Sequence, residues 1–250
     1  MKYSIFHTSH SGSTLLITLL KNHMKTYAEP PWSTLFDMRH ILSAEDNTIV
    51  KYPSGFSVVA RIIPGKKVFL YRRLRDHLEK ITSSPLSLKR HLIRYERLKN
   101  VRNLFPNLIV DNDLKKLAVV WAHNYLDINF SQNVLSIDAN DFFLEPVIYL
   151  RKVTDFFGID PVQDLEPLTF YVKKDFLGKE KALNEINPTE KIPFNIKEGY
   201  VKSDKFLDIE DWVTENIFNQ ISLNEIFPLF RDKDGKPIYS FYPGKTIKLT

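Results

Sequence analysis

Residues 3 to 20 of the chain read Tyr-Ser-Ile-Phe-His-Thr-Ser-His-Ser-Gly-Ser-Thr-Leu-Leu-Ile-Thr-Leu-Leu. A short β-prone run leads into small hydroxylated residues around Gly12, and an apolar run typical of a helix follows. In such a loop the backbone N–H groups can converge on an anion, and the following helix directs the positive end of its dipole there. The stretch therefore predicts a phosphate-binding loop in a protein that handles a nucleotide.

The loop does not match the Walker A motif. That motif, Gly-x-x-x-x-Gly-Lys-Ser/Thr, requires a first glycine where Phe6 or His7 stands and a lysine where Ser13 follows Gly12. The plain alternative is a serine-rich turn in which Ser11 or Ser13 only caps the helix. Both interpretations keep a strand, a turn and a helix at this point.

Length and composition fit one α/β enzyme domain. Of the 250 residues, 43% are hydrophobic and 26% are charged, which allows a large core and excludes wholesale disorder. No apolar run reaches the length of about 20 residues that spans a bilayer, and no secretion signal is evident at the N-terminus. We therefore expect a soluble, cytoplasmic protein without a membrane span. The absence of cysteine excludes disulfides, thiolate nucleophiles and cysteine-bound zinc.

The net charge of +5 indicates an anionic partner. Basic residues are interspersed with acidic ones along most of the chain, apart from the basic stretches 66–75 and 89–102. A site for a small ligand with several negative charges explains this excess as well as nucleic acid does. We expect the small ligand and no nucleic-acid partner.

Predicted strands and helices alternate along the first 160 residues. The β-prone segments are 3–7, 48–51, 67–72 and 134–138, and the helical patterns cover 13–25, 54–63, 74–82, 113–130 and 141–157. This alternation predicts an α/β fold with a central, mostly parallel sheet flanked by helices, the three-layer architecture of P-loop NTPases. The loop would then lie at the carboxyl end of the first strand, where such sheets bind ligands.

We interpret the chain as a single domain over residues 1–250, with a core at about 1–160 and a loop-rich extension at about 161–250. Four prolines interrupt residues 160 to 200, which argues against a second domain there. A helix over 209–221 and a hairpin turning at 232–236, between 229–230 and 238–241, are expected in the extension.

The loop at 8–16 resembles the 5′-phosphosulfate loop of sulfotransferases, commonly Pro-Lys/Arg-Ser-Gly-Thr/Ser-Thr before apolar residues. Residues 68–76 resemble the strand-to-helix motif of that family, an apolar run followed by Arg-x-Pro-x-Asp. Arg72 takes the position of the arginine, Leu74 replaces the proline, and Lys80 stands where a serine usually follows. Residues 134–159 are similar to the core strand and the following helix of the family.

This resemblance implies the transfer of a sulfuryl group from 3′-phosphoadenylyl sulfate to a hydroxyl or amine of a small-molecule or carbohydrate acceptor. The product of the donor is 3′-phosphoadenosine 5′-phosphate, and the scheme requires no metal. The 3′-phosphate would bind to Arg72 and Lys80. The 5′-phosphosulfate would bind to the loop residues Ser9, His10, Ser11, Gly12, Ser13 and Thr14.

Two side chains are expected to act in catalysis. Glu29, followed by two prolines, takes by position the place of a glutamate that is the catalytic base in several sulfotransferase branches. A solvent-facing turn is the plain alternative there. His10 stands where the family has lysine or arginine, and a free imidazole is only about one-quarter protonated at pH 7. A bound donor would raise its pKa and let His10 stabilise the leaving phosphate.

Three further interpretations stay open. Lys51, in Lys51-Tyr52-Pro53, is similar to a lysine that some sulfotransferases place near the donor. A P-loop small-molecule kinase would use residues 134–138 as a Walker-B-like strand, with Asp138 near magnesium. A catalytically silent nucleotide-binding protein would keep the fold without turnover.

Overall fold

The computed structural model describes part of the chain, in two compact units. The described residues are 3–20, 25–27, 48–52, 57, 60, 63–98, 107–129, 131, 133–160, 169–171, 191–193, 199–220, 238–242 and 245–248. One unit draws on residues 1–72 and 127–201 and contains the central sheet; the other draws on 73–126 and 202–250 and is mainly helical.

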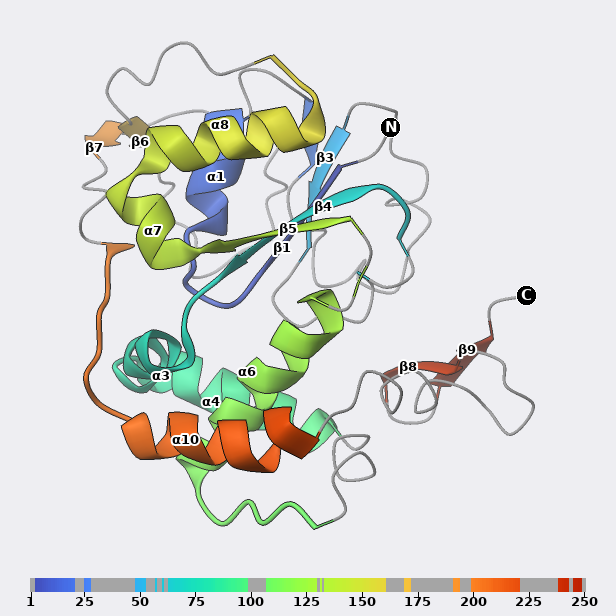
Figure 1. Ribbon diagram of the computed structural model, residues 1–250, viewed down its shortest axis with the longest axis vertical. Coiled ribbons are helices and arrows are strands. Elements are labelled where there is room, and N and C mark those ends of the chain that lie inside the picture. The colour runs from blue at the N-terminus through green and yellow to red at the C-terminus, as the bar shows by residue number, and fades with distance from the viewer. Residues whose placement is uncertain are drawn as a thin grey trace. The chain divides into compact units, whose positions relative to one another are not determined.

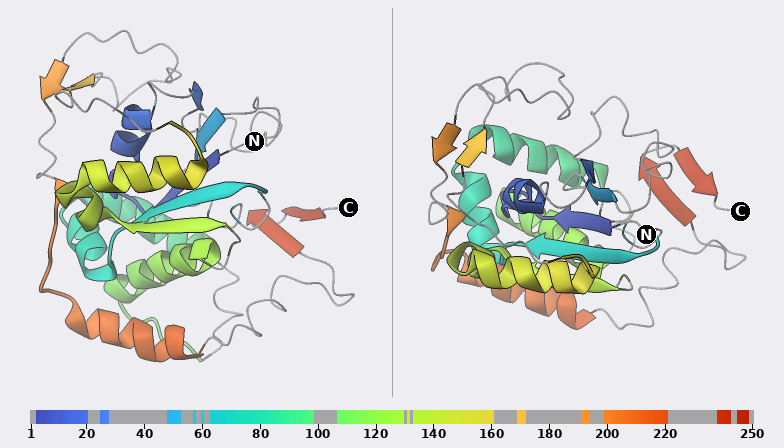
Figure 2. Two further views of the ribbon diagram at one scale, coloured as in Figure 1. Left: turned by 45° about the horizontal axis from the view of Figure 1, so that its top comes forward. Right: turned by 90° about the horizontal axis from the view of Figure 1, so that it is seen from above.

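Five parallel strands form the sheet, in the order β2-β3-β1-β4-β5 (Figure 1). They are β1 (Tyr3–His7), β2 (Lys25–Tyr27), β3 (Thr48–Lys51), β4 (Lys66–Tyr71) and β5 (Val134–Asp138). Ile5 of the central β1 is paired with Lys51 of β3 and with Val68 of β4, and Figure 2 shows β4 and β5 running side by side. Because the strands are parallel, the residues that follow β1, β3 and β4 meet at one edge of the sheet.

Three helices pack on one face of this sheet: α1 (Ser13–Leu20), α7 (Ala139–Leu144) and α8 (Pro146–Phe157). Alternate strand residues such as Ile5, Val68 and Ile137 point into this core, as the two-residue period of a strand requires. All five residues of β1 are buried, which is typical of a central parallel strand. The predicted α/β fold, a parallel sheet flanked by helices, is confirmed.

The helical unit has a core of its own. It contains α3 (Leu74–Thr82), α4 (Pro85–Arg97), most of α6 (Asp113–Asn129), α10 (Leu207–Asn216) and the 3₁₀ helix η5 (Phe218–Gln220). The Trp121 ring stacks on that of Tyr125, with centroids 4.9 Å apart. Asp76 accepts the Ser203 N–H at 2.7 Å, and Arg75 Nε lies 2.6 Å from Glu210, so the start of α3 is fastened to the segment around α10.

Several expected bounds match the structure and others are corrected. Strands 3–7, 48–51 and 134–138 and helix 74–82 are observed as predicted. The helix expected at 13–25 is wrong at its end, because residues 25–27 form β2. Proline at position 146 divides the helix expected at 141–157 into α7 and α8.

The strand expected at 238–241 near the C-terminus is observed, but the described residues do not test the hairpin turn expected before it. Strand β8 (Ile238–Tyr242) pairs antiparallel with the later β9 (Lys245–Lys248), whereas the expected turn at 232–236 lies outside the described residues. A second antiparallel pair joins β6 (Thr169–Tyr171) and β7 (Lys191–Pro193). Within the described ranges, no helix is both long and apolar enough to cross a membrane.

Candidate phosphate-binding site

The loop between β1 and α1 has the backbone of an anion cradle. His10 (φ 61°) and Gly12 (φ 84°) both adopt the left-handed conformation within three residues. Alternation of left- and right-handed residues turns successive N–H groups toward one concave side. Helix α1 begins directly afterwards at Ser13, so its first N–H groups and the positive end of its dipole add to this positive potential.

Hydrogen bonds from the neighbouring strand fix the loop in this shape. Thr8 N donates to the Leu70 carbonyl at 3.1 Å, and Thr8 Oγ1 accepts the Arg72 N–H at 2.9 Å. Inside the loop, the buried Ser11 hydroxyl donates to the Thr8 carbonyl at 2.8 Å. The cradle is therefore held from within and from β4, as a preorganised binding site requires.

Gly12 is needed for space as well as for its backbone conformation. A Cβ atom built on Gly12 would lie 2.6 Å from Cζ of Phe143, a buried ring of α7. A Cβ on Gly199 would lie 2.4 Å from the same ring. The Phe143 ring thus lies directly against the backbone at both glycines and supports the loop from behind.

Lys51 brings a positive charge to the start of α1. It is the last residue of β3, its side chain is buried, and its Nζ donates to Thr14 Oγ1 at 3.0 Å. A lysine beside a phosphate-binding loop can interact with the anion as a point charge. The loop sequence itself contains no lysine, but a lysine of a neighbouring strand lies at the start of α1.

Arg72 follows β4 and brings a second charge to the loop. Its side chain is buried, with 1% of the residue surface exposed. Its Nε donates to the His10 carbonyl at 2.7 Å, one terminal nitrogen donates to the Gly199 carbonyl at 2.6 Å, and the other donates to Asn140 Oδ1 at 3.3 Å. Its guanidinium also lies over the Phe143 ring, 5.5 Å from the centroid. The arginine therefore fixes the left-handed turn at His10 through the His10 carbonyl.

The structure brings seven of the eight predicted binding residues close together, and their role in binding a ligand stays a prediction. The side chains of His10 and Thr14 are exposed, Ser9 is half-buried, and Ser11 and Ser13 are buried. Lys80, in the last turn of α3, belongs to the helical unit. Glu29 lies outside the described residues. The assignments of Lys80 and Glu29 therefore stay predictions.

Sequence reasoning missed Asn140, Phe143 and the segment Gly199–Val201. Asn140 could have been found, because it lies two residues beyond a strand whose carboxyl end meets the same sheet edge as the loop. The segment gave no such signal, since Gly199 is 127 residues from the arginine that it contacts.

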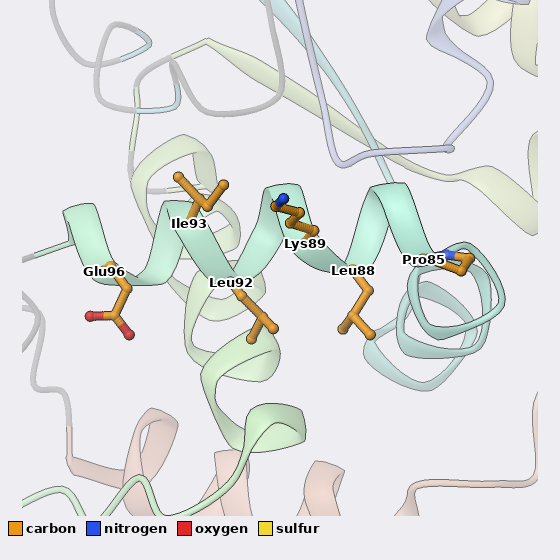
Figure 3. A pocket seen from close by; sticks show the side chains of 6 residues that line it. All are labelled: Pro85, Leu88, Lys89, Leu92, Ile93 and Glu96. Carbon is orange, nitrogen blue, oxygen red and sulfur yellow. The ribbon is translucent and has the colours of Figure 1, made fainter.

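A separate pocket lies along α4 in the helical unit. Figure 3 shows Leu88 and Leu92 on one side of this helix and Ile93 on the other. The lining is apolar apart from two charged side chains, and it consists of Pro85, Leu88, Lys89, Leu92, Ile93 and Glu96. It offers no convergent hydrogen-bonding groups, so the loop is the candidate functional site.

No known protein-family profile matches this chain, and no curated protein matches its sequence. Solved structures that resemble it include mouse sulfotransferase SULT7A1 complexed with PAP, with 15% identity, a TM-score of 0.46 and coverage of 90% of this chain and 87% of that one. The sulfotransferase domain of the Synechococcus PCC 7002 olefin synthase has 14% identity, a TM-score of 0.44 and coverage of 86% and 94%. The sulfotransferase from Alicyclobacillus acidocaldarius has 15% identity, a TM-score of 0.42 and coverage of 69% of this chain and 86% of that one. All three of these proteins are sulfotransferases.

Proposed function

We propose that this protein is a sulfotransferase that uses 3′-phosphoadenylyl sulfate as its donor and a hydroxyl or amine as its acceptor. The observation that carries the proposal is the convergence of two cationic side chains, Lys51 and Arg72, on one left-handed loop at the start of a helix. Such a site suits a ligand with several phosphate-like groups, because N–H groups and side-chain cations reinforce each other.

In the reaction, the acceptor oxygen or nitrogen forms a bond to sulfur while the bond between sulfur and the bridging phosphate oxygen breaks. The acceptor proton passes to a base, for which Glu29 is our candidate from its position in the sequence. Negative charge develops on the 5′-phosphate of the leaving group. Lys51, the cradle N–H groups and a protonated His10 are the groups that would stabilise this charge.

The kinase alternative needs the Asp138 carboxylate near magnesium, and the contacts of Asp138 do not support that role. Asp138 Oδ1 accepts the Asn140 N–H at 2.9 Å and caps α7. The carboxylate therefore already has a structural role as a helix cap.

Arg72 allows a direct test of donor recognition. In isothermal titration calorimetry, the wild type should bind adenosine 3′,5′-bisphosphate more tightly than adenosine 5′-phosphate. Arg72→Ala and Arg72→Lys should weaken bisphosphate binding at least about tenfold more than monophosphate binding, because the guanidinium held beside the loop would no longer attract the 3′ group. Arg75→Ala is the matched control, since Arg75 pairs with Glu210 at 2.6 Å and should leave the preference unchanged.

Equal losses for both nucleotides in folded Arg72 variants would show that Arg72 does not read the 3′ group. Melting curves of each variant verify folding, because removal of a buried arginine also affects stability.

Glu29 is tested by turnover. Glu29→Gln should leave the affinity for the bisphosphate nearly unchanged and lower kcat by a factor on the order of 10² to 10⁴, the usual contribution of a general base. A fully active variant would exclude Glu29 as the base and assign proton removal to another group.

A further inference from the structure

The side chain of Asn140 joins three parts of the site that are distant in sequence. Its Oδ1 accepts the Val201 N–H at 3.2 Å and a terminal N–H of Arg72 at 3.3 Å. Its Nδ2 donates to the Val201 carbonyl at 2.7 Å. Its own backbone N–H is held by Asp138 Oδ1, and only 5% of the residue is exposed.

The two bonds to Val201 imitate the pairing of a neighbouring strand. One amide group both donates to and accepts from the main chain of the same residue, and the separate N–H and C=O groups of an asparagine side chain match this pair of contacts. This contact fastens the segment Gly199–Val201 beside the phosphate loop. The Gly199 carbonyl in that segment then accepts from Arg72 at 2.6 Å.

We propose that Asn140 is a positioning residue, which fixes Arg72 and the segment Gly199–Val201 in one arrangement for binding an anion at the loop. Arg72 carries a long side chain, whose ordering costs up to about 2 kcal/mol of conformational entropy. The hydrogen bonds to Asn140 and Gly199 already order the Arg72 side chain in the free protein, so ligand binding does not have to order it. The anion then encounters a guanidinium that is already oriented. For the sulfate donor as ligand, this inference rests on the function proposed above.

An amide is needed at this position because an acid would disturb both contacts. In Asn140→Asp, the carboxylate could still accept from Val201 N–H and from Arg72, but it would face the Val201 carbonyl with no proton to donate. Its negative charge would also pair with the guanidinium and repel an incoming anion. Asn140→Ala removes the contacts without adding a charge.

These two variants separate positioning for an anion from a merely structural role. We expect the affinity for adenosine 3′,5′-bisphosphate to fall in the order wild type, Asn140→Ala, Asn140→Asp, with a loss of at least about tenfold for Asn140→Ala and a larger one for Asn140→Asp. The charge that aspartate adds repels an anion whether or not Asn140 orients Arg72, so Asn140→Ala carries the distinction. A role confined to packing predicts that the folded alanine variant binds the bisphosphate about as tightly as the wild type. Asn129→Asp, the same exchange at a residue that accepts from Ser136, is the control and should change affinity less than about threefold.

Inorganic pyrophosphate serves as a second probe, and amide hydrogen exchange serves as a readout without ligand. Failure of the wild type to prefer the bisphosphate over adenosine 5′-phosphate would contradict the proposed function, while the same order of variants with pyrophosphate would still support the role of Asn140.

In the free protein, protection of the Val201 N–H should fall at least about tenfold in Asn140→Ala and change less than about threefold in Asn140→Asp, because the aspartate keeps the acceptor. Unchanged protection of the Val201 N–H in Asn140→Ala, or wild-type anion affinity in folded Asn140→Ala, would overturn the inference.

Discussion

His10 contributes to the loop through its backbone, and its side chain is proposed to act in catalysis. Its φ of 61° is uncommon for a residue other than glycine, and its carbonyl accepts from Arg72 Nε at 2.7 Å. The imidazole itself is exposed at the loop surface. These two contributions can be separated, because glycine adopts the same backbone conformation without strain and lacks the ring.

We expect His10→Gly to keep donor affinity and lose turnover, if the imidazolium stabilises the leaving phosphate. The loss should reach about 10²-fold or more, as for removal of one preorganised donor. His10→Lys should retain activity and extend it to higher pH, since lysine keeps its proton above the range in which histidine titrates. Rates measured from pH 6 to 9 with one accepted substrate verify this. A fully active His10→Gly variant, or an unchanged alkaline limb in His10→Lys, would limit His10 to its backbone role.

Gly12→Ala should disrupt the loop by two effects. Alanine at φ 84° is strained by about 1–2 kcal/mol, and its Cβ would displace the buried Phe143 ring, which typically costs a further amount of about 1–3 kcal/mol. Gly158→Ala is the matched control: φ is 74° there, and the nearest atom to a new Cβ is Lys66 Nζ at 3.8 Å.

Urea unfolding should therefore show a larger loss of stability for Gly12→Ala than for Gly158→Ala, and only Gly12→Ala should lose nucleotide binding. Equal losses of stability in the two variants would mean that Phe143 does not support the loop at Gly12.

At the level of elements, the sheet was predictable because its signals are local. β1, β3 and β5 are short β-prone segments bounded by charged or turn residues, and each begins and ends where predicted. The three-residue β2 was not predictable, since its strand character depends on pairing with β3. Residues 13–25 therefore suggested a longer helix than the one that ends at Leu20.

The same distinction between local and distant signals applies to the site. The loop and Arg72 each follow a predicted strand, so parallel topology brings them together. Asn140 and Val201 are in contact although they are 61 residues apart in the sequence, and the sequence around neither residue predicts that contact. The sequence thus indicated the cradle, Arg72 and, as an open interpretation, Lys51, but not the side chains that orient Arg72.

Tyr52 links the end of β3 to the centre of the sheet unit and gives a pH-dependent prediction. Only 1% of this residue is exposed, its ring stacks on Phe6 with centroids 4.6 Å apart, and its hydroxyl is hydrogen-bonded to Ser4. Burial raises the pKa of Tyr52 well above its ordinary value, an effect that the bond to Ser4 partly offsets. The folded state therefore retains this proton when the unfolded state loses it, and stability falls as the pH rises above the ordinary tyrosine value of about 10.

Tyr52→Phe removes this pH dependence. At pH 8 the variant should be less stable by about 1 kcal/mol, the usual contribution of a hydrogen bond. At pH 11 the free energy of unfolding of the wild type should have fallen by about 1.4 kcal/mol through this tyrosine, whereas the variant shows no such fall. The stability difference between the two proteins is then cancelled or reversed. Urea unfolding of both proteins at the two pH values measures their free energies of unfolding. A stability difference between wild type and variant that is the same at both pH values would contradict the burial of the hydroxyl.

At the level of the whole molecule, each compact unit has its own hydrophobic core. The contacts described here among the loop, Lys51, Arg72, Asn140 and the segment Gly199–Val201 all lie inside the unit with the parallel sheet. This unit therefore contains the loop and the two cationic side chains on which the proposed donor binding mainly depends.

The most direct test of the proposed function is the thermal unfolding of the full chain with two competing ligands. Adenosine 3′,5′-bisphosphate without any metal should stabilise the protein, by about 2.7 kcal/mol when its concentration is 100 times its dissociation constant. ATP with magnesium at the same concentration should stabilise it much less, because the loop does not match the Walker A sequence and the Asp138 carboxylate already caps α7. Stronger stabilisation by ATP with magnesium than by the bisphosphate would contradict the sulfotransferase assignment.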